Sequence, residues 1–167
     1  MPLIRNGRLA DDPWTALADD AELPPTGAVI VSLARFRTER EVLFNRGAPL
    51  GIRLKSSELA AEVGADAPRL DLIAIDFPVF RDGRGYSTAR LLRERWGFAG
   101  ELRAVGNVLR DQLLFMDRCG FDAFEVESPD AVAAWEKALA EFSVFYQPAT
   151  DARVPARLQR LQRRAAS

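Results

Sequence analysis

The sequence predicts one α/β domain, in which about five mainly parallel strands alternate with helices. Two observations support this fold class. Short apolar runs recur along the chain, and the segments between them carry the start and stop signals of helices. The chain has 167 residues, 48% of them hydrophobic and 28% charged, which fits a single soluble globular domain. We expect a doubly wound sheet, with a partial, TIM-barrel-like arrangement as the alternative.

The first 27 residues predict a short hairpin and then an irregular segment. Asn6 and Gly7 stand between two short apolar flanks, which is a strong local signal for a β-hairpin. The acidic stretch that follows ends in two prolines and a glycine, so we expect no regular element there. We therefore divide the chain into an N-terminal hairpin and lead-in (1–27), an α/β domain (28–145) and a basic C-terminal tail (146–167).

Three apolar runs predict the first strands of the α/β domain: residues 28–33, 50–54 and 70–75. The third run is continuously hydrophobic, which is typical of a central strand. Between the first two runs, Thr38 and Glu41 have the spacing of a capping box and predict a helix that ends by residue 47. A second helix is expected between residues 56 and 64.

The next part of the chain repeats a helix–turn–strand unit. Gly97 and Gly120 each follow a helical pattern and precede a phenylalanine. Each glycine predicts a left-handed helix terminus, with the phenylalanine packing back on the last turn. We expect the two helices to begin near Ser87 and Asn107, and the two strands to follow at residues 102–105 and 123–126.

A last helix and a basic tail complete the chain. The helix should have Ser128 at its cap and Pro129 at its first position. Residues 151–167 hold five arginines and one aspartate, and this tail has helical character. The acidic N-terminal segment and the basic tail either pair with each other, bind a partner, or are both solvated.

Composition excludes several classes of function. There is no histidine, so the commonest general base and metal ligand is missing, and the single cysteine, Cys119, cannot complete a zinc site. We expect no metal site, and no cofactor motif is recognisable. The net charge of −1 gives no general attraction to nucleic acid or to an anionic membrane. No apolar run reaches the roughly 20 residues of a membrane span, and without a secretory signal we expect a cytoplasmic protein.

The strongest candidate for a functional site is the loop and helix start at residues 76–87. In parallel α/β proteins ligands bind beside the carboxyl ends of the strands, and this loop follows the central strand. Asp76, Asp82 and Tyr86 are candidate catalytic groups. The ligand-binding candidates are basic and polar residues near helix starts: Arg81, Arg84, Ser87, Arg90 and Asn107. Together they predict an oxyanion or phosphate site. The alternative is a solvated loop in which Asp76 pairs with a nearby arginine and Tyr86 packs beside Phe80.

Several segments resemble one proteobacterial family of unknown function. They include Asp11-Asp12-Pro13-Trp14 near the N-terminus, Asp82-Gly83-Arg84-Gly85-Tyr86-Ser87 in the candidate site and Arg118-Cys119-Gly120-Phe121-Asp122 further on, and the likeness covers residues 1–127. Members of that family are described as oxidoreductases involved in sulfite reduction, because their genes lie beside that of the sulfite reductase haemoprotein. The resemblance implies a role in assimilatory sulfur metabolism, with sulfite reductase or its electron donor as the partner.

Three functions are therefore considered. The first, which we favour, is an accessory protein of sulfite reduction that acts with sulfite reductase or its electron donor. The second is a small enzyme or sensor that binds a sulfur oxyanion or a phosphate-bearing ligand at the 76–87 loop. The third is a non-catalytic structural subunit. No nicotinamide, flavin or iron–sulfur motif accompanies the redox activity that the resemblance implies, so the question of catalysis stays open.

Overall fold

Eight short strands form one curled sheet in the described part of the chain. The structure is a computed structural model, and it describes residues 2–127, 130–151 and 153–165. The strands are β1 (Leu3–Arg5), β2 (Arg8–Ala10), β3 (Trp14–Ala16), β4 (Ala28–Ser32), β5 (Leu50–Leu54), β6 (Leu72–Phe77), β7 (Glu101–Gly106) and β8 (Ala123–Glu125). From β3 to β8 the strands run parallel, each beside the next in the sequence. The hairpin of β1 and β2 extends the sheet beyond β8 in antiparallel pairing.

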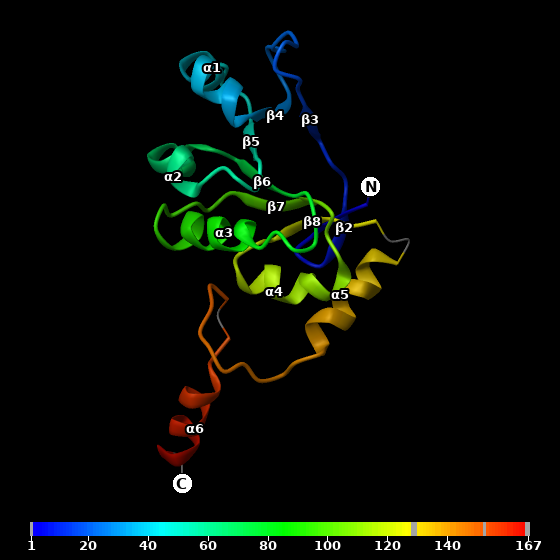
Figure 1. The fold of residues 1–167 in the computed structure, drawn as a ribbon, viewed down its shortest axis with the longest axis vertical. Helices are drawn as coiled ribbons and strands as arrows, with labels where there is room; N and C mark the ends of the chain where they lie inside the picture. Colours follow the sequence, from blue (N-terminus) through cyan, green and yellow to red (C-terminus); the bar gives the residue numbers. More distant parts are fainter. Residues whose placement is uncertain (1, 128–129, 152, 166–167) are drawn as a thin grey trace.

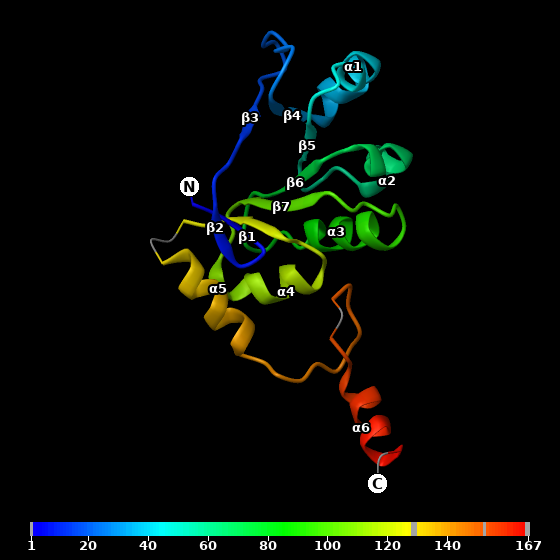
Figure 2. The ribbon, with the colours of Figure 1, turned by 180° about the vertical axis from the view of Figure 1, so that it is seen from behind.

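The described helices are α1 (Leu33–Asn45), α2 (Ala60–Val63), α3 (Arg84–Glu94), α4 (Leu113–Arg118), α5 (Ala131–Ala140) and α6 (Ala156–Ala165), with 3₁₀ turns at Gly64–Arg69 and Arg110–Gln112. The helices between the parallel strands, α1 to α4, lie along one side of this sheet (Figures 1 and 2). Right-handed crossovers that always step in the same direction place their helices on the same face of a sheet. Figures 1 and 2 show α1 to α4 stacked in this way. The sheet is therefore a half-barrel. The doubly wound arrangement that we predicted is wrong, because the strand order never reverses, and the barrel-like alternative describes the fold.

The turn signals of the sequence are confirmed. Asn6 and Gly7 both have positive φ, 50° and 76°, as a two-residue hairpin turn of type I′ requires. Gly97 has a φ of 63° and follows α3, and the N–H of Phe98 donates to the carbonyl of Leu92 at 2.9 Å. Gly120 ends the next unit in the same left-handed conformation, with a φ of 102°.

Helix starts differ from the predicted ones. Ser32, at the end of β4, caps α1 by accepting a hydrogen bond from the N–H of Arg35 at 3.0 Å, so this helix begins before Thr38. The predicted capping box instead lies at a kink, where Glu39 has a φ of −112°. Gly83, not Ser87, is the N-cap of α3. The predicted start of the last helix, Ser128 and Pro129, lies outside the described residues.

The N-terminal segment covers the inner face of the half-barrel. β3 lies in the segment that we expected to be irregular. β2 and β3 form the two opposite edges of the sheet, yet only three residues separate them in the sequence. Four Cα–Cα steps span at most about 15 Å, so the two edges approach each other across the open side. We call residues 11–16 the strap. Trp14 of the strap packs on a small apolar cluster of the inner face, formed by Ile30, Leu72, Ala74 and Val105. The larger core lies between the outer face and the helices.

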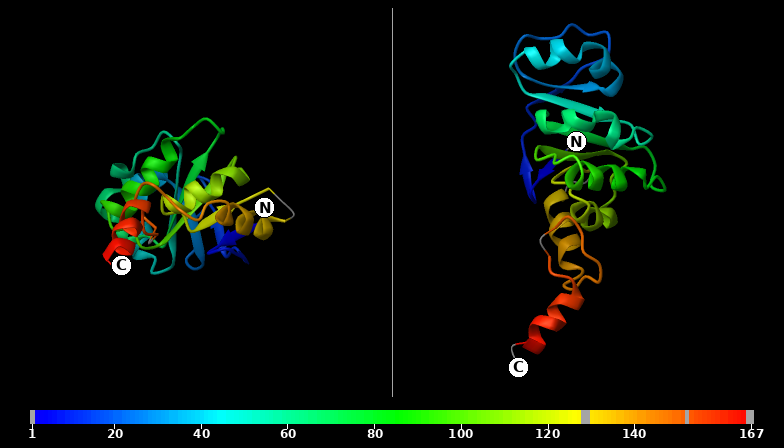
Figure 3. Two further views of the ribbon diagram at one scale, coloured as in Figure 1. Left: turned by 90° about the horizontal axis from the view of Figure 1, so that it is seen from below. Right: turned by 90° about the vertical axis from the view of Figure 1, so that its left-hand side faces the viewer.

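After α5 the chain continues as an arm, residues 141–151 and 153–165, which ends in α6. The arm extends away from the half-barrel, and α6 lies at its far end (Figures 1 and 3). The start of the arm is fixed to α4, because Arg118 lies 3.1 Å from the carboxylate of Asp151 and donates to the carbonyl of Gln147 at 2.7 Å. Among the described helices, none combines the length and the hydropathy needed to cross a bilayer.

Candidate functional site

The carboxyl ends of the six parallel strands meet at one edge of the half-barrel, where barrel enzymes carry their active sites. β6 brings Asp76 to this edge, and the loop at residues 78–83 follows it. Side chains alternate along a strand, so Asp76 lies on the inner face while Phe77 belongs to the outer core. The predicted site residues are therefore divided between the two faces of the sheet.

Asp76 is paired with Arg53 of the neighbouring strand β5. Nη2 of Arg53 lies 2.8 Å from Oδ1 of Asp76. We expected Asp76 to pair with a nearby arginine, and Arg53, which shares the inner face of the sheet with Asp76, is that partner. The end of β7 also approaches this carboxylate. A Cβ added to Gly106, which has a φ of 89°, would lie 2.9 Å from Oδ1 of Asp76. Asp76 is thus enclosed by a cation and by the backbone of β7.

Asp82, Arg84 and Ser56 form a second polar cluster at the same edge. Nε and Nη2 of Arg84 lie 2.9 and 2.7 Å from the two carboxylate oxygens of Asp82, a bidentate pair. Nη2 of Arg84 also donates to the hydroxyl of Ser56, at 3.2 Å. The hydrogen bonds from Arg84 and Ser56 hold the pKa of Asp82 well below its ordinary value. Asp82 is therefore a stable carboxylate, and it does not act as a general acid near neutral pH.

Tyr86 lies on the other side of the sheet, beneath the helices. Its ring packs against Phe77 at a centroid distance of 5.2 Å and against Phe115 at 4.8 Å. The predicted neighbour, Phe80, is instead exposed over 52% of its surface. Burial raises the pKa of Tyr86 to about 12, and its hydroxyl is hydrogen-bonded to Gln112. Tyr86 is a packing residue, and the strand itself separates it from Asp76.

The other predicted ligand-binding residues do not gather around one point. Ser87 is exposed within α3, and Arg90 pairs with Glu94 at 2.8 Å. Arg90 follows Arg84 by six residues, which places it about 9 Å further along the helix. Arg81 is exposed in the loop. Asn107 is also exposed, and its N–H donates to the carbonyl of Phe77 at 2.7 Å, which holds the loops after β6 and β7 together.

A cluster around Arg103, on the inner face of β7, was missed from the sequence. The Arg103 side chain is only 1% exposed, and three carboxylates surround it. Its nitrogens lie 2.8 Å from Asp12 of the strap, 2.7 Å from Glu101 and 3.3 Å from Glu125. Burial alone lowers the pKa of Arg103, but hydrogen bonds to Asp12 and Glu101 outweigh burial and raise it. The alternation of Leu102, Arg103, Ala104 and Val105 is a signal that could have shown an arginine facing the inside of the sheet.

The Arg103 cluster fastens the strap over the interior of the half-barrel. Both nitrogens at the end of the guanidinium reach Asp12, at 2.8 and 3.0 Å. In a closed barrel this interior is filled by layers of side chains from the strands. Here Arg103, its carboxylates and Trp14 of the strap fill the same space. The interior is therefore a structural centre that holds the N-terminal segment in place.

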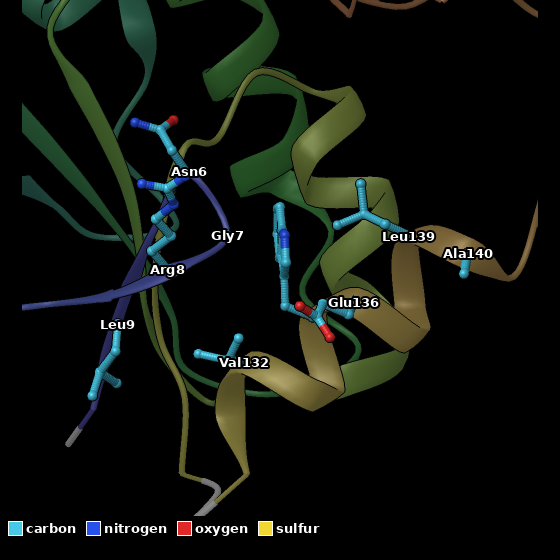
Figure 4. Close-up of a pocket in the computed structure, with 9 residues that line it drawn as sticks. Asn6, Gly7, Arg8, Leu9, Val132, Glu136, Leu139 and Ala140 are labelled. Atoms are coloured by element: carbon cyan, nitrogen blue, oxygen red, sulfur yellow. The ribbon is translucent and has the colours of Figure 1, made fainter.

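A groove also separates the hairpin from α5 (Figure 4). It has a volume of about 740 Å³ and is lined by Asn6, Gly7, Arg8, Leu9, Val132, Trp135, Glu136, Leu139 and Ala140. The hairpin turn passes so close to α5 that a Cβ on Gly7 would lie 2.6 Å from the indole nitrogen of Trp135. The groove is mainly apolar, with one cation and one anion at its margins. None of the residues that we predicted for the site lines it.

Fold and site together define a half-barrel α/β protein in which the two carboxylates predicted for the site, Asp76 and Asp82, are each paired with an arginine. The chain belongs to a family of bacterial proteins of unknown function, DUF934, which matches residues 51–157. The matched range runs from β5 to the first turn of α6, so it contains the candidate site and most of the arm. The description of the family does not link it to sulfite reduction or to an oxidoreductase activity. No curated protein matches the chain.

Proposed function

We propose that this protein is an accessory protein of assimilatory sulfite reduction, which acts by binding sulfite reductase or its electron donor. The resemblance of residues 1–127 suggests the partner. The geometry of the carboxyl edge supports binding over catalysis. Asp76 and Asp82, the two carboxylates predicted for the site, are each neutralised by an arginine, and Tyr86 is packed away from both.

The observation that carries the proposal is the apolar surface left on this edge. Val79 and Phe80 are exposed over 56% and 52% of their surface at the tip of the loop after β6. Leu109, in the loop after β7, is also partly exposed. Arg81, directly after Phe80 in the loop, is exposed, and Arg84 follows three residues further on. Exposed apolar groups beside arginines are the composition of a protein–protein interface.

The test is direct binding to purified components. Immobilised full chain should bind the sulfite reductase haemoprotein or its electron donor, and Phe80→Ser should raise Kd about tenfold or more, because buried aromatic side chains dominate interface energies. Val42→Ser is the matched control, since Val42 is exposed to a similar extent on α1. Absence of binding at high protein concentration to both components would refute the accessory role and leave a structural subunit as the explanation.

A second candidate is an oxyanion or phosphate site at the 76–87 loop. It is favoured by the start of α3, where the N-cap residue, Gly83, offers no side chain to the helix N-terminus and the exposed Arg81 lies nearby. Asp82 competes with any anion, because its carboxylate already binds Arg84. Sulfite, sulfate and phosphate should raise the melting temperature of the protein, and Arg84→Ala should abolish the rise. Equal shifts in the variant would exclude this site.

A further inference from the structure

The C-terminal arm leaves the half-barrel at a defined point. Arg118, at the end of α4, pairs with Asp151, and both the N–H and the hydroxyl of Thr150 donate to the carbonyl of Arg118, at 3.2 and 2.7 Å. The guanidinium of Arg118 also lies over the ring of Phe145, 4.1 Å from its centroid. The arm is therefore built onto α4, and α6 follows from this base.

The helix at the end of the arm exposes about half of its leucine surface. Leu158 and Leu161, one turn apart in α6, are exposed over 49% and 52% of their surface. The helix has ten residues, and isolated helices shorter than about 12–15 residues are marginal in water. Most helices of this length gain their stability by packing an apolar face against something else. In Figures 1 and 3, α6 extends beyond the rest of the molecule.

The charge of this helix is also unbalanced. Residues 153–165 hold five arginines and no acidic residue. Arg153 pairs with Asp117 and Asp151 at the base of the arm, whereas Arg157 and Arg160 form no ion pair with any described residue. A surface that covers α6 should therefore supply anionic groups, which in a protein are carboxylates, as well as apolar contacts.

The arm has a concave hollow beside α6, which we call the notch. It has a volume of about 410 Å³ and lies between the start of the arm and the helix, lined by Tyr146, Pro148, Pro155, Leu158 and Leu161 among others. Tyr146 is the most exposed large apolar side chain of the described residues. The arm thus offers a ridge of leucines and a concave notch next to it, which suits interlocking side chains of another protein.

We propose that the C-terminal arm is a second docking element of this protein, in addition to the apolar surface at the carboxyl edge, and that it binds an apolar groove bordered by aspartate and glutamate side chains on a partner protein. The mode is that of an amphipathic helix lying in a groove, with Leu158 and Leu161 as anchors and Arg157 and Arg160 at the rim. This inference rests on the proposed accessory function, because it takes sulfite reductase or its electron donor as the partner.

Two other occupants fit the arm less well. A second copy of the chain that paired α6 with α6 would bring arginines against arginines, and like charges in contact are unfavourable. An anionic membrane would attract the arginines, but two leucines bury little apolar surface in a bilayer, and the notch would stay unfilled. A protein groove satisfies the leucines, the arginines and the notch together.

The experiment compares binding of the full chain and of two arm variants to the purified haemoprotein and electron donor. Leu158→Ser/Leu161→Ser should raise Kd about thirtyfold, the effect expected when anchors are lost. Arg157→Glu/Arg160→Glu should lower the association rate constant about tenfold or more at low salt and remove its salt dependence. Val42→Ser and Arg95→Glu, exposed positions outside the arm, are the matched controls. Circular dichroism checks that each variant is folded.

Each result bears on the inference. Loss of binding in both arm variants, with the controls unchanged, supports it. If the full chain binds and the arm variants bind equally well, the arm is not a docking element, while the proposed function stands. If the full chain binds neither component, both the proposed function and this inference are wrong. Binding to vesicles of phosphatidylcholine and phosphatidylglycerol in equal parts, or concentration-dependent self-association that the arm variants abolish, would overturn the inference in favour of a membrane or a second copy.

Discussion

Arg103→Met should destabilise the protein strongly, because the arginine is the single cation that three carboxylates share within the half-barrel. Methionine keeps much of the aliphatic volume, so the loss measures charge more than packing. Asp12, Glu101 and Glu125 lie within 2.7 to 3.3 Å of the guanidinium. Of these three carboxylates, Glu101 has a second ion-pair partner among the described residues, Arg5, at 2.6 Å. Removing one partner of a buried ion pair costs about 3–5 kcal/mol. We expect the lower end, about 3 kcal/mol, since the carboxylates are partly solvated.

Urea unfolding at pH 7, followed by tryptophan fluorescence, measures this loss, and Trp14 reports on the strap. The loss should shrink at acidic pH. Burial alone would raise the pKa of Asp12, but the hydrogen bond and the charge of Arg103 outweigh burial and lower it, and this stabilisation disappears once Asp12 is protonated. Arg8→Met, at an exposed position, is the matched control and should change the free energy of unfolding by no more than about 0.5 kcal/mol. An Arg103→Met protein within about 1 kcal/mol of the wild type would refute the view that this cluster fastens the strap.

Three further outcomes follow from particular contacts. Gly7→Ala should lower the free energy of unfolding by about 1–3 kcal/mol, because the φ of Gly7 is 76° and the new Cβ would lie 2.6 Å from Trp135. Thermal unfolding should show a larger loss of stability for this variant than for Gly27→Ala, where φ is 88° but no atom lies within 4 Å of the new Cβ. Burial raises the pKa of the Cys119 thiol to about 11. A thiol reagent at pH 8 should therefore label the folded protein slowly and the unfolded protein fast. Equal labelling rates would contradict the buried position of Cys119. Burial also raises the pKa of Tyr86 from 10.0 to about 12. The contribution of Tyr86 to the free energy of unfolding is therefore complete below pH 10 and is lost as the pH rises towards 12. Tyr86→Phe should remove the absorbance change of the tyrosine that ionises at the higher pH.

Local signals in the sequence predict local structure well. Asn6 and Gly7 form the predicted hairpin turn, and the strand at Leu50–Leu54 has the predicted bounds. Gly97 ends its helix in the predicted left-handed conformation. Each of these features depends on residues that are near in sequence. Where φ is positive, glycine is strongly favoured, so the sequence alone identifies the position.

Features that depend on distant residues were predicted less well. The doubly wound arrangement is wrong because the face on which each crossover helix packs is not encoded in the strands themselves. β3 was missed because three residues beside Pro13 carry too little periodic signal. At the site, the 76–87 loop was placed correctly at the carboxyl edge, but the partner of Asp76 is Arg53, which only the register of β5 and β6 identifies.

The place of β1 in the sheet has a consequence for biosynthesis. β1 leaves the ribosome first, yet Leu3 pairs with Glu125 of β8, the last strand of the sheet to be made. The nascent hairpin must therefore wait, unpaired on one edge, until all of the parallel strands have emerged. Contacts so far apart in sequence slow folding, and β1 cannot take its place in the sheet before β8 has been made.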